Sequence, residues 1–126
     1  MNYLSHNKLA DWRNKNKPTR CPLVEYKTSN WVVDHNHTSG FVRGVVSSEG
    51  NVLLGRIENA FKRLSRDAKK ASLPTILRNM ADYLERGDTD VLHPEGCKQL
   101  YKRFFSLSKD LQLDILLKFG TNRDDI

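Results

Sequence analysis

The segment WVVDHNH, residues 31 to 37, ends a short apolar run with a carboxylate and two imidazoles. Asp34 opens this polar group, and Asn51 lies seventeen residues further along the chain. Carboxylate and amide oxygens suit Mg²⁺, which keeps most of its coordination positions for water and substrate phosphate. A histidine beside such a site, here His35, is suited to take a proton from an attacking water. These residue types therefore indicate metal-assisted hydrolysis of a phosphate ester.

Two strands and a helix must position these groups. β-branched and aromatic residues gather in NWVVDH and FVRGVV, and the intervening NHTSG has turn chemistry, which predicts a hairpin. Apolar residues then recur at spacings of three and four, which predicts a helix from about 49 to 70, capped by Ser47 or Ser48. Folding the hairpin onto this helix would bring Asp34 and Asn51 together.

The rest of the chain is predicted to be helical. We expect a weak amphipathic helix over 3–16, and further helices over 72–84, 97–106 and 108–120, with a loop over 87–96 and a frayed tail over 121–126. The fold class is α+β and predominantly helical. We expect residues 1–70 to form the first helix and the hairpin–helix core, and residues 71–126 a helical C-terminal region, the two together forming one cooperative unit.

Charge is unevenly distributed along the 126 residues. The net charge is +6, yet residues 1–78 hold fourteen Lys and Arg against six acids, a net of +8, and residues 79–126 hold seven against nine, a net of −2. A basic half is typical of a polyanion binder, although a solvated basic face gives the same composition. Basic residues on the predicted helix that could contact DNA are Arg56, Lys62, Arg63 and Arg66.

Cysteine usage and hydropathy favour a soluble, cytoplasmic protein. Cys21 and Cys97 are too few and too far apart for a disulfide framework. No run of about 18 apolar residues is present, so no membrane association is expected, and the N-terminal segment lacks the apolar core of a signal peptide. Trp12 and Trp31 are expected in the core, Cys97 as a small buried residue, and His93 as a residue that caps a helix or packs.

The motif DHNHTSGFVRGVV, followed by EGNVLLG, resembles the phage recombination endonuclease VII family. The similarity continues through LPTILRNMADYLERGDTDVLHPEG and RFFSLSKDLQLDILLKFG. This resemblance implies a ββα-metal core of the HNH or His-Me finger type, with helical extensions at both ends. It also implies a homodimeric, Mg²⁺- or Mn²⁺-dependent endonuclease that resolves Holliday junctions in phage recombination or packaging.

By the same resemblance, Asp34 and Asn51 are the metal ligands and His35 is the general base. His37 is a second catalytic histidine, which contacts phosphate or assists the leaving group. The sequence leaves open which of the two histidines is the base. Arg43, in the matching Val-Arg-Gly, either contacts DNA phosphate or braces the loop.

One departure concerns the two Cys-x-x-Cys pairs with which this family holds a structural zinc. Only Cys21 is retained, because Val24, Ser47 and Gly50 occupy the other three positions. A structural zinc normally needs four Cys or His ligands, so no structural zinc is expected. Apolar contacts are expected to replace the cross-link, from Leu23, Val24, Trp31 and Val46.

Three alternatives remain at the level of sequence. Asp34 and Asn36 could simply start a turn, with His35 and His37 as exposed loop residues. The same catalytic centre could belong to a homing or nicking endonuclease that acts on duplex DNA. The departure from the zinc pattern also permits a DNA-binding protein whose nuclease site has decayed.

Overall fold

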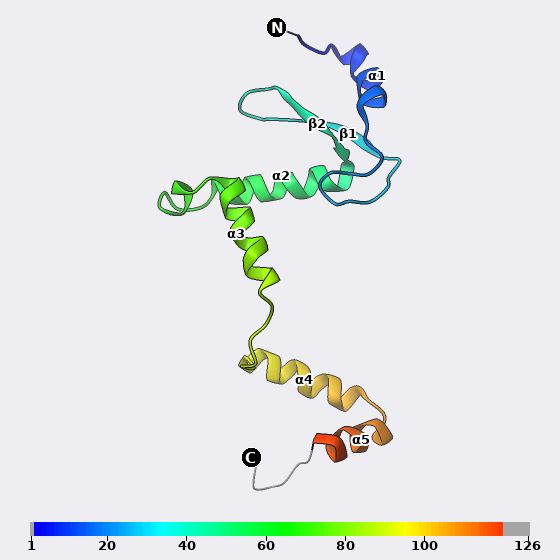
Figure 1. Ribbon diagram of the computed structural model, residues 1–126, viewed down its shortest axis with the longest axis vertical. Helices are drawn as coiled ribbons and strands as arrows, with labels where there is room; N and C mark the ends of the chain where they lie inside the picture. The colour runs from blue at the N-terminus through cyan, green and yellow to red at the C-terminus, as the bar shows by residue number, and fades with distance from the viewer. Residues whose placement is uncertain (1, 120–126) are drawn as a thin grey trace. The chain divides into compact units, whose positions relative to one another are not determined.

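The computed structural model describes residues 2–119 (Figure 1). Over this range the chain is α+β and mostly helical, with five α-helices, a short 3-10 helix and one two-stranded antiparallel sheet. The predicted fold class is confirmed at this level. The chain divides into two compact units, residues 1–81 and residues 82–126. The predicted tail over 121–126 lies outside the described residues.

The two strands form the predicted hairpin. β1 (Trp31–His35) pairs antiparallel with β2 (Val42–Ser47). Both helices that flank the hairpin in sequence, α1 (His6–Asn16) and α2 (Ser48–Lys62), contact both strands (Figure 1). The hairpin is therefore the centre of the first unit.

The turn between the strands is built around one asparagine. The side-chain oxygen of Asn36 accepts hydrogen bonds from the backbone N–H groups of Thr38 at 2.8 Å and Ser39 at 3.1 Å. Gly40 has a φ of +79°, a left-handed conformation that glycine adopts without strain. Asn36 is thus the turn-forming residue of the motif, as one of the alternatives expected.

The core of the first unit is small and is centred on β2. Val45, Val46 and Cys21 are almost completely buried, with 4%, 5% and 1% of their surface exposed. Trp12 and Trp31, both expected in the core, are half-buried. Few apolar side chains are thus fully removed from water, so the polar contacts at the edges of the hairpin matter for its stability.

α2 ends eight residues before the predicted helix end at 70. After Lys62 the hydroxyl of Ser65 accepts from the backbone N–H of Ala68 at 3.2 Å, and the ammonium of Lys69 donates to the carbonyl of Lys62 at 2.8 Å. Such local side-chain bonds offer the backbone an alternative to the helix. Residues 68–70 form a separate 3-10 helix instead.

Helix α3 (Leu73–Glu85) matches its prediction closely. The hydroxyl of Ser72 accepts from the backbone N–H of Thr75 at 3.3 Å, as expected for an N-cap. After the helix, Gly87 has a φ of +76°, and its N–H donates to the carbonyl of Leu84. Both predicted ends of this helix are confirmed.

The remaining helices are α4 (Pro94–Ser106) and α5 (Lys109–Phe119). α4 begins three residues before the predicted position 97, because the Nδ1 atom of His93 accepts from the backbone N–H of Glu95 at 3.0 Å and caps the helix. The predicted capping role of His93 is thus confirmed. Cys97 is exposed on this helix, so the prediction that it is buried was wrong.

Large apolar side chains remain exposed along α3, α4 and α5. They include Met80, Tyr83, Leu84, Leu100, Tyr101, Phe105, Leu113 and Leu117. Among residues 2–119, none of the helices has the length and apolar character needed to cross a bilayer.

Candidate functional site

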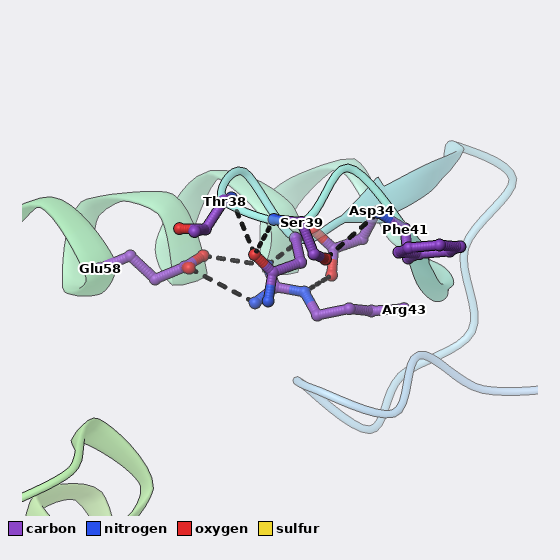
Figure 2. A network of polar contacts seen from close by, with 7 residues as sticks. Asp34, Thr38, Ser39, Phe41, Arg43 and Glu58 are labelled. Carbon is purple, nitrogen blue, oxygen red and sulfur yellow. Dashed lines mark hydrogen bonds and ion pairs between the residues drawn. The ribbon is translucent and has the colours of Figure 1, made fainter.

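Asp34 is a buried carboxylate held by one arginine. Only 6% of Asp34 is exposed, although it stands next to the exposed end of β1. Arg43 donates to it through two atoms, from Nε to Oδ2 at 2.7 Å and from Nη2 to Oδ1 at 3.0 Å (Figure 2). A charge-assisted pair of this fork-to-fork type is short and directional. The carboxylate is therefore fixed in place and faces a cationic group, unlike the turn-starting residue of the alternative interpretation.

A bulge in the hairpin places the arginine beside this carboxylate. Asp34 pairs with Gly44 and His35 pairs with Val42, so Arg43 is the extra residue of β2. Bulges of this kind redirect a side chain and recur beside active sites. The glycine of Val-Arg-Gly was the sequence signal for this bulge, because glycine inside a strand often marks one.

Glu58 shares the same guanidinium. Its two carboxylate oxygens accept from Nη2 of Arg43 at 3.0 Å and from Nη1 at 3.3 Å (Figure 2). The hydrogen bonds that Arg43 donates to Asp34, and then to Glu58, raise the pKa of Arg43 above its usual range, so the guanidinium stays charged. Sequence reasoning missed Glu58 entirely. Its position seven residues after Asn51, on the same face of α2, was an available signal.

His35 and His37 lie together at the start of the turn. Their ring centroids are 4.6 Å apart and their planes are inclined at 35°. Both side chains are exposed. The structure therefore brings the two predicted catalytic histidines side by side, with both accessible to a substrate.

Asn51 lies in the first turn of α2, half-buried, directly after the buried Gly50. α2 contacts both strands of the hairpin, including β1, which carries Asp34. One carboxylate and one amide oxygen are the hard donors that Mg²⁺ prefers, and two protein ligands leave positions for water and phosphate. Arg43 donates to both oxygens of Asp34, so a metal ion would have to displace the guanidinium. By their chemistry, the two oxygen donors suit a hard divalent cation.

Four positions of this chain match the zinc cysteines of the family. Three of them, Cys21, Ser47 and Gly50, lie close together. The thiol sulfur of Cys21 accepts from the backbone N–H of Ser47 at 3.2 Å, and the hydroxyl of Ser47 accepts from the N–H of Gly50 at 2.9 Å. A Cβ atom on Gly50 would lie 3.0 Å from the Ser47 hydroxyl and 3.2 Å from the Cys21 sulfur. The segment that contains Cys21 is thus connected to the segment that contains Ser47 and Gly50 by polar contacts.

The predicted apolar replacement of the zinc cross-link is only partly observed. Val46 is buried and Trp31 is half-buried, but Leu23 is 43% exposed. Within residues 2–119, no three His, Cys, Asp or Glu side chains gather closely enough to hold a metal ion together. The absence of a structural zinc stays a prediction.

Cys21 has an altered acidity. Burial raises the pKa of the thiol, but hydrogen bonds from Ser47 and from the backbone of Val24 and Leu23 outweigh it and lower the pKa to about 7. Donors aimed at a sulfur stabilise the thiolate. The connection between Cys21 and Ser47 therefore strengthens when the thiol ionises.

The predicted DNA-binding residues fall into two groups. Arg56, Lys62, Arg63 and Arg66 are exposed. Arg43 differs, because its guanidinium is paired with two carboxylates and only 35% of its side chain is exposed. Bracing of the site is thus the role that its contacts support in this state.

The family model for recombination endonuclease VII matches residues 4–86. Hairpin, α2 and every residue of the site lie within this range, which is about two thirds of the chain. The protein is thus a nuclease by class, with DNA as the substrate that the class implies. It belongs to the recombination endonuclease VII family. None of the curated proteins compared with the chain matches it.

Proposed function

We propose that the protein is a divalent-metal-dependent endonuclease of the HNH, or ββα-metal, type that resolves branched DNA in phage recombination or packaging. The observation that carries this proposal is the buried Asp34 carboxylate beside two adjacent exposed histidines, in a chain of this family. Hairpin and α2 would form the ββα-metal core. Mg²⁺ or Mn²⁺ would be held by Asp34 and Asn51.

When bound, the cation would neutralise charge that develops on the phosphate and on the leaving oxygen. His35 would take the proton from the attacking water, and His37 would orient the phosphate or assist the leaving group. The ring centroids lie 4.6 Å apart, so either histidine would be close enough to act on the same phosphate. Their exposure is what a base needs in order to meet a substrate as large as DNA.

The exposed arginines and lysine of the α2 region would contact DNA backbones. Arg56 and Arg63 lie seven residues apart on α2 and at its end, so they share one face of the helix. Such contacts release counterions, and affinity should fall steeply with salt. The basic surface would thus hold the DNA while the hairpin presents the catalytic groups.

Resolution of a junction needs paired nicks on two strands, which favours a homodimer with two active sites. The exposed apolar side chains on α3, and separately those on α4 and α5, support this assembly, because exposed apolar surface commonly marks contact with another subunit. A homing or nicking endonuclease with the same centre is the alternative, and would act on linear duplex as a monomer.

Digestion of a mobile four-way junction, alongside linear duplexes of matched sequence, tests the proposal. We expect Mg²⁺-dependent paired nicks in the junction, and binding of the junction at least about tenfold tighter than of duplex, or roughly 1.4 kcal/mol. Light scattering should give a dimer. A monomer that cuts and binds both DNAs equally would favour the nicking enzyme, and binding without any cleavage would favour a decayed site.

A further inference from the structure

Asp34, Arg43 and Glu58 form a chain of three charged groups in which one cation serves two anions. Nη2 of Arg43 lies 3.0 Å from Oδ1 of Asp34 and 3.0 Å from Oε1 of Glu58. The side chains of Asp34 and Glu58 are 7% and 24% exposed, so solvent screens the cluster only in part. Its net charge is −1.

That net charge matters for the predicted cation. Asp34 and Arg43 alone would form a neutral pair. Such a pair would have little electrostatic attraction for a divalent ion, because the positive charge of Arg43 cancels the negative charge of Asp34. Glu58 draws on the same guanidinium through two hydrogen bonds, at 3.0 and 3.3 Å. It therefore restores negative potential at Asp34 and offers Arg43 a second partner to hold when Asp34 turns to a metal ion.

We infer that Glu58 is a positioning residue that makes Asp34 available to a divalent cation by sharing Arg43, and that Arg43 acts as an internal counter-ion which the cation displaces from Asp34. This inference rests on the proposed metal site. Glu58 acts through Arg43, without touching the cation. Nothing in the family match assigns a role to this pair.

This arrangement predicts that two substitutions have opposite effects on Mg²⁺ affinity measured without DNA. Glu58→Gln keeps an acceptor for the guanidinium but removes one negative charge, so Mg²⁺ should bind at least about fivefold more weakly, which is the effect of one unit charge on a divalent ion at roughly 8 Å when bulk water screens the pair fully. Arg43→Gln removes the competing cation, so Mg²⁺ should bind at least about fivefold more tightly.

Asp67→Asn is the charge-matched control. It removes the same charge, but Asp67 lies beyond the end of α2, its side chain is 87% exposed, and it pairs with Lys70 at 3.0 Å, so water screens its charge. Mg²⁺ affinity is read from amide shifts of residues 34–36 and 51 in NMR titrations of the full chain at low salt, without DNA. Urea unfolding of each variant reports any purely structural role.

The expected result is weaker Mg²⁺ binding by Glu58→Gln and wild-type affinity, within twofold, for Asp67→Asn. Equal affinity of Glu58→Gln and Asp67→Asn would overturn the inference, and would leave Glu58 as a brace for the hairpin. If Arg43→Gln fails to fold, Arg43→Met, which keeps an unbranched side chain but also removes the charge, should still bind Mg²⁺ more tightly. Wild-type affinity in Asp34→Asn would instead refute the proposed metal site itself, which distinguishes that failure from failure of the inference.

Discussion

Replacement of Gly50 by alanine should destabilise the first unit, although Gly50 lies within a helix. The added Cβ would meet three atoms: the Ser47 hydroxyl at 3.0 Å, the Cys21 sulfur at 3.2 Å and the Cβ of Leu23 at 3.2 Å. Two of these atoms cannot move freely, because the hydroxyl caps α2 and the sulfur accepts from the Ser47 backbone. Ser47 is 0% exposed and Cys21 is 1% exposed, so neither side chain has solvent to move into.

The change in the free energy of unfolding for Gly50→Ala is the sum of a destabilising packing contribution and a stabilising contribution from helix propensity. Overpacking of this kind costs about 1–3 kcal/mol, and disturbance of the Ser47 cap adds to it. Alanine offsets part of the cost through its helix propensity, by less than about 1 kcal/mol. We expect a net loss of about 1–2 kcal/mol in the free energy of unfolding.

Gly55→Ala is the matched control in the same helix. No atom lies within 4 Å of a Cβ built at Gly55, so alanine there should stabilise the unit by about 0.5–1 kcal/mol through helix propensity alone. Urea unfolding followed by tryptophan fluorescence measures both variants, and reports the first unit because Trp12 and Trp31 are the chain's two tryptophans. A Gly50→Ala variant as stable as Gly55→Ala would refute the close contact of the three segments.

The free energy of unfolding should rise by on the order of 2 kcal/mol between pH 7 and pH 9. In the folded chain the pKa of the Cys21 thiol is lowered from 9.0 to about 7. Over this pH range the unfolded chain therefore binds more protons than the folded chain, so raising the pH favours the folded state. Cys21→Ala should lack this rise, and a wild-type pH profile in that variant would contradict the assignment. Purified protein should contain no stoichiometric zinc, and EDTA should stop cleavage without unfolding the chain. Elemental analysis that finds one zinc per chain after dialysis would show this to be wrong.

Much of the fold could be predicted from local sequence patterns. The hairpin follows from the gathering of β-branched and aromatic residues around an Asn-x-Thr-Ser-Gly turn. The helix starts follow from the serines that precede them. Of the two candidates for α2, Ser47 is the cap, and the hydroxyls of Ser47, Ser72 and Ser108 all accept from backbone N–H groups. The end of α2 was missed, because periodic apolar residues continue past Lys62 while Ser65 turns the backbone away from the helix.

The candidate site could be predicted from the sequence only in part. Asp34, His35, His37 and Asn51 are placed by short-range motifs, and the structure brings the two histidines into contact. The pairing of Arg43 with Glu58 joins residues fifteen positions apart, and it depends on a bulge whose position periodicity alone does not give. The polar link of Cys21 to Ser47 spans 26 residues, so an apolar replacement of the zinc was the simpler expectation.

Single-turnover cleavage of a four-way junction tests the central claim most directly. Wild-type protein, His35→Ala and Asn51→Ala are compared at protein concentrations above saturation of the junction, with Mg²⁺ and with EDTA. We predict Mg²⁺-dependent cleavage by the wild type and a rate at least ~10²-fold lower for each variant, with junction affinity nearly unchanged, because the variants lose a base or a metal ligand but no basic surface. Wild-type rates in both variants, or wild-type cleavage that persists in EDTA, would contradict a metal-dependent centre built on Asp34, His35 and Asn51.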